Sequence, residues 1–582
     1  MITMINNNIA RYLPQMARER PEQVAVVMGG KRDKLGKVAY ERLSFAELDR
    51  DSDCYAWGLS AFGLGAGSRV LLMVRPGLPL IGLTFALFKV GCVPVLIDPA
   101  MGRRNLAQCI EECAPEALIG VPRAHLARLL FPRAFRSVKR AVVVDGPLMP
   151  GADVRLGELR AEISAPFPLE IVAADTLAAI LFTTGSTGVP KGVCYSHGMF
   201  EAQVRVLREL YGIAPGEVEM PAFPLFALFN VALGCTSAIP PIDPTRPASC
   251  DPAAVIEFIH DQQVTSTFGS PAIWANVTRY ALDRQLRLPS LRRVLMAGAP
   301  VPAALHERFA QILEPSANTH TPYGATEALP VSSISGREVL AAHAERAEPT
   351  AGTCVGRAVP GVTLRIIAIS DEPIASWSDA LLIAPYQVGE IVVKGPAVTT
   401  TYVNRPRSTA LAKIVEGEQI WHRMGDLGYL DDQGRLWFYG RKSQRVEAAG
   451  GPLYTEPVEL IFNQHARVAR SALVGVDGGR ETVGGRRWTL NGARLLAQKL
   501  LKRATVHPHS PTLPTVIIEP LAGHMPKTAA QREVFIAELR AIGARYPMSE
   551  HITGFLFHPA FPVDIRHNAK IFREQLATWA EK

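Results

Sequence analysis

The sequence predicts an α/β protein with a large N-terminal domain and a smaller C-terminal domain. Its 582 residues are too many for one hydrophobic core, so two or more domains are expected. Strand and helix patterns alternate between residues 43 and 144 and again between 253 and 296, which is typical of doubly wound α/β layers. Beyond residue 352 the pattern turns to short β segments, which predict a small β-rich subdomain, and an α+β unit follows.

The large domain is expected to consist mainly of parallel strands connected by helices. Strand, helix and strand at the observed lengths form a right-handed crossover. The pattern predicts helices at 45–62, 78–90, 253–260 and 272–282, strands at 70–74, 93–97, 266–269 and 293–296, further alternation at 110–144, and later β segments at 363–369, 389–394 and 436–439. Because ligands of such folds bind at the carboxyl ends of strands, the loops that follow strands are the candidate sites.

One of these loops has the composition of a phosphate-binding loop. An apolar run at 177–182 is read as a buried strand, and it opens into Thr183, Thr184, Gly185, Ser186, Thr187, Gly188, Val189, Pro190 and Lys191. Glycines let backbone N–H groups turn inward, hydroxyls add donors and the lysine adds a positive charge, which suits a polyphosphate. A Walker loop is excluded because Lys191 precedes Gly192 instead of Ser or Thr. Ser196 is expected to cap a helix that runs to about Tyr211.

Polar motifs follow several later strands. A Tyr ring can stack on a purine, a Thr hydroxyl can reach a phosphate, and a Glu carboxylate offers hard oxygens to Mg²⁺. A second carboxylate can accept two ribose hydroxyls at once. The motifs are Gly298-Ala299-Pro300, Thr321-Pro322-Tyr323-Gly324-Ala325-Thr326-Glu327, Gly425-Asp426-Leu427-Gly428 and Gly440-Arg441.

The loop and these motifs together resemble the adenylate-forming superfamily of acyl-CoA synthetases, luciferases and peptide-synthetase adenylation domains. The resemblance covers nearly the whole chain and implies ATP and Mg²⁺ as cofactors. It implies the following contacts: Thr183, Thr184, Gly185, Ser186, Thr187, Gly188 and Lys191 on the phosphates; Gly298, Ala299 and Pro300 on adenine; Tyr323, Gly324 and Thr326 on the nucleotide; Glu327 on the metal; Asp426 on the ribose; and Arg441 on the nucleotide.

The same resemblance implies a mobile C-terminal domain, with residues 1–442 forming the large AMP-binding domain and 443–582 the small one. The pattern there predicts helices at 456–464 and 529–544 and strands at 472–476, 515–519 and 552–557. Lys570 matches a catalytic lysine that would sit between the substrate carboxylate and the α-phosphate, beside Lys191 and Glu327 as the other catalytic residues. Ser443 stands where the superfamily usually has Asp or Lys, and the segment 449–452 lacks the usual arginine.

Composition excludes several classes of protein. The net charge is +8, from 62 basic and 54 acidic residues, and it is scattered, so nucleic-acid binding is not expected. Residues 1–14 lack the apolar core of a signal peptide, and eight spread cysteines are read as free thiols, so a cytoplasmic protein is expected. The uncharged segment 220–242 is read as a buried helix or tunnel wall, because Pro221, Pro224, Pro240 and Pro241 shorten any helix. Peripheral membrane contact is left open if the substrate is a lipid.

Within the superfamily, some details resemble the olefin β-lactone synthetases. These are Ala227 in the segment 223–229, Ser443, and the ending His567-Asn568-Ala569-Lys570. The resemblance implies that a long-chain β-hydroxy fatty acid is activated as acyl-AMP and that its own hydroxyl closes a β-lactone in olefin biosynthesis. The alternatives are a long-chain acyl-CoA ligase that uses CoA, and a binding or scaffold protein with a decayed site. Docking to other enzymes of a hydrocarbon pathway is left open, and no residue is identified as the base for the hydroxyl.

Overall fold

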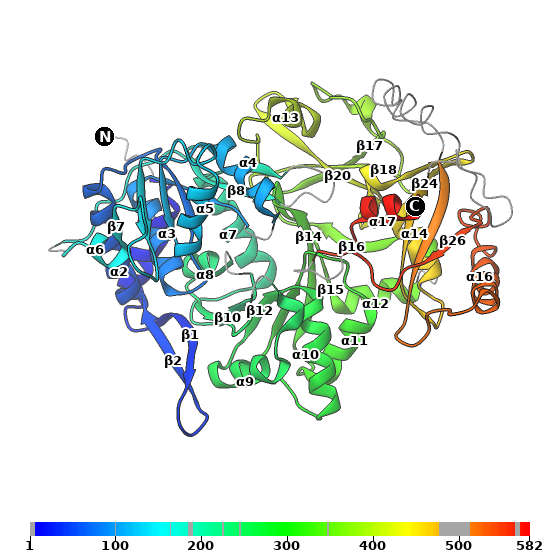
Figure 1. Ribbon diagram of the computed structural model, residues 1–582, viewed down its shortest axis with the longest axis horizontal. Coiled ribbons are helices and arrows are strands. Elements are labelled where there is room, and N and C mark those ends of the chain that lie inside the picture. The colour runs from blue at the N-terminus through cyan, green and yellow to red at the C-terminus, as the bar shows by residue number, and fades with distance from the viewer. Residues whose placement is uncertain are drawn as a thin grey trace.

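The computed structural model describes residues 6–98, 101–162, 165–183, 190–223, 226–243, 246–345, 348–476, 512–564 and 571–582. In Figure 1 the N-terminal strands and helices lie on the left, the central ones at the bottom, and the C-terminal ones on the right. Two large sheets dominate the described chain, and a small sheet lies near the C-terminus. The predicted α/β class is confirmed.

A seven-stranded sheet occupies the N-terminal part, with helices on both of its faces. Strand β3 (Arg69–Met73) shows why both faces are covered. Val70 and Leu72 pack into one apolar cluster with α2 (Phe45–Ala61) and α3 (Leu78–Val90), while Leu71 packs into another with α4 (Arg103–Cys113). The strands are parallel except for the pair β8 and β9. In sheet order they are β7 (Val154–Arg155), β6 (Arg140–Val143), β5 (Ala117–Gly120), β3 (Arg69–Met73), β4 (Val93–Leu96), β8 (Leu177–Thr183) and β9 (Lys191–Ser196). The helices are α2 (Phe45–Ala61), α3 (Leu78–Val90), α4 (Arg103–Cys113), α5 (Pro122–Leu130) and α6 (Leu156–Leu159).

The larger sheet has fourteen strands in the described chain and changes character along its width. Its parallel part consists of β1 (Val24–Arg32), β11 (Thr236–Ile239), β10 (Val218–Pro221), β12 (Ser266–Gly269), β13 (Arg293–Met296) and β14 (Asn318–Ala325), with β2 (Val38–Ser44) antiparallel at the edge. Antiparallel strands then continue through β15 (Ala328–Ser335), β16 (Thr353–Ala358), β21 (Leu436–Arg441), β20 (Gln419–Leu430), β18 (Gly389–Lys394) and β17 (Thr363–Ile367), while β19 (Lys413–Glu416) pairs with β20. This second half is the predicted β-rich subdomain.

Helices pack on the parallel part of this sheet. Ser196 accepts a hydrogen bond from the Met199 backbone and so caps α7, as the sequence predicts. The largest buried ring, Trp274, lies in the cluster that joins α9, α10 and α11 to the sheet. The helices of this part are α1 (Tyr12–Glu19), α7 (His197–Tyr211), α8 (Ala227–Leu233), α9 (Pro252–Gln262), α10 (Pro271–Asp283), α11 (Ala303–Ile312) and α12 (Gly336–Glu345). Helix α13 (Pro406–Ala412) instead contacts β19 and β20 in the antiparallel part.

The C-terminal part forms an α+β unit of the predicted kind. Three strands form its sheet, in the order β24 (Val468–Val476), β25 (Leu513–Pro520) and β26 (Gly554–Phe557), and β22 (Val446–Ala448) pairs with β23 (Gly451–Leu453). Helices α14 (Thr455–Phe462) and α16 (Ala529–Gly543) enclose the apolar cluster around Phe462 and Phe535, and α17 (Arg573–Ala580) covers a second cluster around Leu576.

The segment 220–242 contains a buried helix, as the sequence predicts, but the helix is much shorter than the apolar stretch. The segment contains the end of β10, the seven-residue helix α8 and then β11. Proline has no N–H to donate and clashes with the preceding turn, so Pro221 and Pro240 limit the helix to the residues between them. Ala227 and Val231 are fully buried, so the segment lies inside the fold as expected. In the described residues, no helix is long and apolar enough to cross a membrane.

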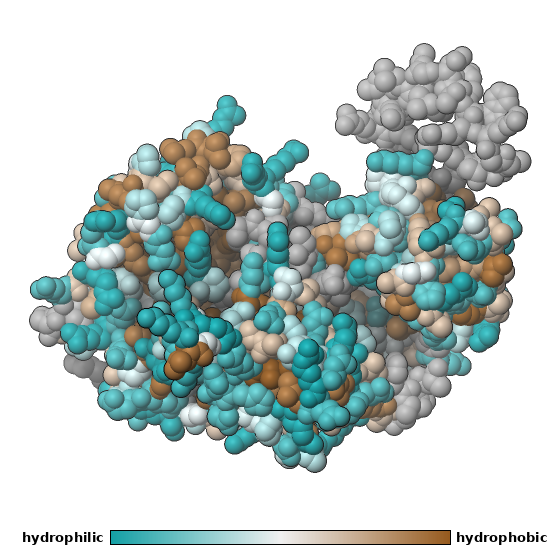
Figure 2. Space-filling view, turned by 60° about the horizontal axis from the view of Figure 1, so that its bottom comes forward, coloured by the Kyte–Doolittle hydropathy of each residue, from teal (hydrophilic) through white to brown (hydrophobic). Residues whose placement is uncertain are grey.

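The surface is mixed in character. Figure 2 shows hydrophobic residues as small areas separated by hydrophilic ones. All eight cysteines are free, and four of the most deeply buried ones, Cys92, Cys109, Cys113 and Cys235, lie in or beside the apolar cores. The free-thiol prediction is confirmed.

Candidate active site

Tyr323, Asp426 and Arg441, which lie far apart in the sequence, form one hydrogen-bonded cluster. The Tyr323 hydroxyl donates to Asp426 Oδ2 at 2.6 Å, and Arg441 Nη1 lies 3.0 Å from Asp426 Oδ1. The pairing of β20 with β21 places Asp426 directly opposite Arg441. Asp426 is 2% exposed, whereas the Arg441 side chain is 38% exposed. The ion pair is therefore open to solvent, and to a ligand, on the arginine side.

The electrostatics fix the protonation states of this cluster. Burial raises the pKa of Tyr323 well above its usual range, and the Asp426 carboxylate raises it further while Arg441 opposes the shift. The Asp426 charge raises the pKa of Arg441, and Glu327 adds to that effect. The cluster thus presents a neutral phenol as donor, a carboxylate as acceptor and a permanent cation.

Glu327 lies at the turn between β14 and β15, and its carboxylate is held by a residue that the sequence analysis missed. The Tyr402 hydroxyl donates to Glu327 Oε1 at 2.7 Å. Burial, followed by the Glu327 charge, holds the Tyr402 pKa above its usual range, so the phenol stays a donor. The backbone N–H and the hydroxyl of Thr399 donate to the Glu327 carbonyl at 2.9 and 3.0 Å. Both ends of Glu327 are therefore positioned by the segment 399–402.

Two lysines lie on the ring of Tyr402. Lys191, the last residue of the loop and the first of β9, has its Nζ 5.0 Å from the ring centroid, and Lys413 Nζ is 5.9 Å away. Lys413 is buried and hydrogen-bonds the Thr399 carbonyl and hydroxyl. Burial lowers its pKa to about 7, against the effect of Glu327. Tyr402 thus joins the loop lysine to the candidate metal ligand.

The segment that carries Tyr402 also joins the two large sheets. Val403 N donates to Gly192 O at 2.8 Å, and Tyr402 forms a bridge with Val193 in β9. On the other side Val398 forms a bridge with Ala328 in β15. We call residues 398–403 the bridging segment. The sequence carries a signal for Lys413, which is the one charge inside the apolar run 410–415, but nothing local marks Tyr402.

The remaining predicted residues fall in two groups. Gly298, Ala299 and Pro300 follow β13, which pairs in parallel with β14, so they lie at the same sheet edge as Tyr323 and Gly324. Gly298 has φ +90°, a conformation that favours glycine. Thr326 is held by its carbonyl, which accepts from the Tyr195 hydroxyl, and Thr183 ends β8 opposite Lys191. Outside the described residues lie Thr184, Gly185, Ser186, Thr187, Gly188 and Lys570.

An apolar pocket adjoins this sheet edge. It measures about 20 Å³, enough for one or two water molecules and not for an alkyl chain. Aromatic rings fill the space around it, with Phe226 stacked on Phe268 at 4.0 Å between centroids. An acyl chain would have to displace such rings. The lining residues are Gln203, Leu207, Tyr211, Phe226, Phe229, Phe268, Leu295, Pro322, Leu329 and Pro330.

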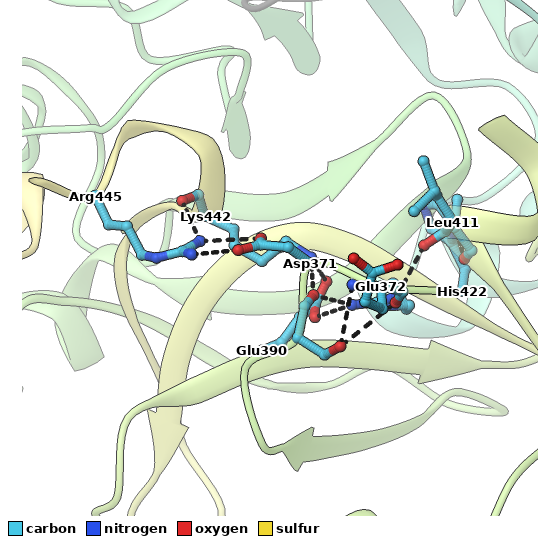
Figure 3. Close-up of polar contacts among 10 residues, drawn as sticks. Asp371, Glu372, Glu390, Leu411, His422, Lys442 and Arg445 are labelled. Carbon is cyan, nitrogen blue, oxygen red and sulfur yellow. Dashed lines mark hydrogen bonds and ion pairs between the residues drawn. The ribbon is translucent and has the colours of Figure 1, made fainter. Parts of the chain in front are cut away.

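A second ion-pair cluster lies at the predicted domain boundary (Figure 3). Glu390 in β18 pairs with Arg423 Nη2 at 2.7 Å and with Lys442 Nζ at 2.9 Å, and the Glu390 and Arg423 side chains are each 1% exposed. Lys442 Nζ also donates to the Ser370 carbonyl at 2.7 Å. Arg445 pairs with Asp371 at 2.5 Å. These contacts attach residues 442–445 to the loop at 370–372.

Comparison with known proteins places this geometry in a family. Residues 13–403 match the model of the family described as AMP-binding enzyme. The chain is 46% identical over 580 residues to an olefin beta-lactone synthetase of Stenotrophomonas maltophilia, covering 98% of each chain. It is 46% identical over 579 residues to an olefin beta-lactone synthetase of Xanthomonas campestris, covering 98% of this chain and 97% of the relative.

Solved structures share the fold. The amide bond synthetase McbA from Marinactinospora thermotolerans has a TM-score of 0.74 at 21% identity, covering 98% of this chain and 99% of that one. The O-succinylbenzoate coenzyme A synthetase MenE from Bacillus subtilis, solved with ATP and magnesium ion, has a TM-score of 0.71 at 20% identity, covering 97% and 98%. The chain belongs to the adenylate-forming AMP-binding enzyme family.

Proposed function

We propose that the protein converts a long-chain β-hydroxy fatty acid and ATP into a β-lactone, AMP and pyrophosphate. The observation that carries the proposal is the 46% identity to two olefin beta-lactone synthetases over 98% of this chain. Two groups of contacts support the first step, because their residue types suit a nucleoside triphosphate. One joins Tyr323, Asp426 and Arg441, and the other joins Lys191 and Glu327 through Tyr402.

In the first step, a substrate carboxylate oxygen attacks the α-phosphorus of ATP, and pyrophosphate leaves. Gly298, Ala299, Pro300, Tyr323 and Gly324 would line the adenosine, and Thr326 would reach the α-phosphate. Asp426 would bind the ribose, and Arg441 would contact the nucleotide. The loop from Thr183 to Gly188 with Lys191 would hold the departing phosphates. Lys570 would lie between the two anions and offset their repulsion. Tyr402 would keep Lys191 and Glu327 in fixed relative positions, since it contacts both.

Mg²⁺ fits this site through Glu327. The described residues contain no group of three or more His, Cys, Asp or Glu side chains that could enclose a metal ion. Mg²⁺ is commonly bound by one or two carboxylates together with substrate phosphates and water, so a single well-positioned Glu is a suitable donor set. When bound, the ion supplies charge neutralisation on the phosphates. Tyr402 keeps the Glu327 carboxylate oriented in the meantime.

In the second step, the β-hydroxyl oxygen attacks the acyl carbonyl carbon. A C–O bond closes the four-membered ring, the bond to the AMP oxygen breaks, and the hydroxyl proton is released. Ring strain opposes closure, but intramolecular attack can reach an effective molarity on the order of 10⁵ M or more. Water must be excluded from the site during this step, because it would otherwise hydrolyse the acyl-AMP.

The domain boundary belongs to the same proposal. We place it at residue 442, with a mobile C-terminal domain from 443 to 582 that brings Lys570 to the site. The contacts of Lys442 and Arg445 with residues 370–390 would set the position from which it rotates. A cytoplasmic location, and contacts with a membrane or with other enzymes of the pathway, remain predictions.

Product analysis with and without CoA tests the proposal. The protein is incubated with ATP, Mg²⁺ and a long-chain β-hydroxy acid, and we expect β-lactone and AMP in the absence of CoA. A thioester that forms only with CoA, with no lactone in either case, would instead support an acyl-CoA ligase. That alternative has some support, because a long-chain-fatty-acid–CoA ligase of Thermus thermophilus is 25% identical over 461 residues, covering 78% of this chain and 82% of the relative.

The role of Lys570 is tested separately through pyrophosphate release. We expect Lys570→Ala to raise the activation free energy of adenylation by about 3 to 4 kcal/mol, as removal of a single electrostatic stabiliser typically does. Lys527→Ala, an exposed lysine of the same C-terminal part, serves as control and should leave the rate unchanged. Equal rates in both variants would remove Lys570 from the catalytic set.

A further inference from the structure

Gln203 is a buried amide in a pocket with otherwise mainly apolar walls. It lies on α7, is 4% exposed, and lines the pocket together with Leu207, Phe226 and Phe268. A buried polar side chain in such surroundings costs stability unless its hydrogen bonds are satisfied. Both polar atoms of the Gln203 amide therefore need hydrogen-bond partners.

Only one end of the amide is satisfied by the described chain. Gln203 Nε2 donates to the Leu329 carbonyl at 2.9 Å, and a carbonyl can only accept, so this contact fixes which end is nitrogen. Gln203 Oε1 is shielded from solvent and has no hydrogen-bond partner among the described residues. The Tyr211 hydroxyl, the other polar side-chain group of the lining, already bonds to Ser333 Oγ at 3.0 Å. Gln203, a lining residue of the pocket, thus carries one buried acceptor that needs a donor.

This acceptor lies next to the predicted adenylation residues. Leu329, which holds the amide, is in β15, two residues beyond Glu327 in the chain, and Pro322 of the pocket lining directly precedes Tyr323. Tyr195, whose hydroxyl donates to the Thr326 carbonyl, packs in the same apolar cluster as Leu207 and Phe226 of the pocket lining. A substrate group at Oε1 would therefore lie a few atoms from the carboxyl end of the substrate.

We infer that Gln203 Oε1 accepts a hydrogen bond from the β-hydroxyl of the substrate acid and is the residue that selects hydroxylated over unsubstituted acids. The inference rests on the proposed function. An unsubstituted alkyl chain would leave Oε1 without a donor, whereas a hydroxyl supplies one without bringing charge into the pocket. The same bond would orient the hydroxyl oxygen as a nucleophile, so Gln203 is a specificity and positioning residue.

The test compares two acids of equal chain length, one with and one without a β-hydroxyl. Acyl-AMP formation is followed as pyrophosphate release, and lactone is measured as product. Gln203→Met keeps the length of the side chain and removes the acceptor, and Leu207→Met changes another wall of the same pocket without touching a polar group. Melting temperatures of both variants check that each one folds.

We expect the wild type to prefer the hydroxylated acid in kcat/KM. Gln203→Met should reduce this preference about 10- to 100-fold, mainly through the hydroxylated substrate, and Leu207→Met should retain it. The wild type should also discriminate between the two enantiomers of the β-hydroxy acid, because one acceptor on one wall favours one configuration. That discrimination should fall in Gln203→Met, which a purely structural role would not cause.

Two results would count against the inference in different ways. If Gln203→Met slows both acids equally, or keeps the hydroxyl and enantiomer preferences, the role of Gln203 is wrong while the proposed function stands. If the wild type releases no pyrophosphate with either acid, the proposed function fails and the role of Gln203 fails with it.

Discussion

Arg441 and Lys442 are consecutive residues that pair with different carboxylates in different surroundings. Arg441 pairs with Asp426, and its side chain is 38% exposed. Lys442 pairs with Glu390, and the two side chains are 17% and 1% exposed. The Arg441–Asp426 pair is accessible to a ligand. In the Lys442–Glu390 pair, Glu390 also binds Arg423 and Lys442 also donates to the Ser370 carbonyl, so both side chains are already occupied. Two consecutive residues thus form one ion pair that is partly exposed and one that is buried.

Breaking the buried pair should give the largest effect. Glu390→Gln keeps the shape but leaves the Arg423 charge, 1% exposed, without a carboxylate. Removing one partner of a buried ion pair typically costs about 3 to 5 kcal/mol, so the melting temperature should fall by several degrees. Differential scanning calorimetry measures it, with Glu416→Gln, a more exposed carboxylate paired with Lys394, as the control. An unchanged melting temperature would show that the ion pairs of Glu390 contribute little to stability.

The partly exposed pair should affect binding more than stability. Asp426→Asn weakens both the ion pair with Arg441 and the predicted acceptor for the ribose, so kcat/KM for ATP should fall about 100-fold, or about 2.7 kcal/mol. The melting temperature should change little, because Arg441 can be hydrated. When 2′,3′-dideoxy-ATP replaces ATP, kcat/KM should fall strongly for the wild type and only slightly for the variant. Equal losses in both proteins would place the ribose elsewhere.

A third buried acidic side chain, Glu219, has only neutral hydrogen-bond partners and should make the stability of the protein depend on pH. Glu219 accepts from Asn230 Nδ2 at 2.5 Å, and burial raises its pKa from 4.5 to about 8, although the bonds from Asn230 and the Phe268 backbone oppose the shift. The folded protein therefore retains a proton that the unfolded chain loses above pH 4.5. Its contribution to stability is complete below that pH and is lost as the pH rises through about 8.

Glu219→Gln removes this dependence. Relative to the wild type, the free energy of unfolding of the variant should rise by on the order of 2 kcal/mol between pH 5 and pH 7. Thermal melts at the two pH values measure the difference, and Glu257→Gln, at a carboxylate paired with Arg32 on the surface, is the control. A wild type that keeps the same difference from the variant at both pH values would contradict the shifted pKa.

The smallest effect is expected at Tyr402. Tyr402→Phe removes the hydrogen bond to Glu327 Oε1 but keeps the ring against Lys191, so adenylation should slow about 5- to 10-fold, or about 1 kcal/mol. The loss should appear as a higher Mg²⁺ requirement in a titration of pyrophosphate release. Tyr402→Leu, which also removes the ring, should slow the reaction further. Identical rates in the two variants would exclude a role for the ring.

Local patterns in the sequence predict the elements better than the connections between them. The helix at 78–90 and the strands at 266–269 and 293–296 have the predicted bounds, because apolar runs with clear breakers define them. The β segment predicted at 363–369 ends at Ile367, and strand β9, which follows the loop, was not predicted at all. The segment 220–242 divides into strand, helix and strand because sheet pairing outweighs its uniform apolar composition.

Motifs in the sequence single out some residues of the candidate site, whereas residues that join it through tertiary contacts carry no such mark. Tyr323, Asp426 and Arg441 come from three motifs and form one hydrogen-bonded cluster. Tyr402 and Lys413 belong to no motif, and only the folding of the bridging segment between two sheets brings them to Glu327. Gln203 resembles any polar residue on an amphipathic helix until the pocket around it is known.

The bridging segment also requires a glycine at position 192 for packing. In the sequence Gly192 ends a phosphate-binding pattern, but in the structure a Cβ on this residue would overlap the Val403 side chain and crowd the Phe182 ring. The glycine is therefore required for close packing between two chain segments, independently of any anion. A larger residue here would push the bridging segment, which carries Tyr402, away from β9, so the effect of a substitution at this position reports on the packing between the two sheets.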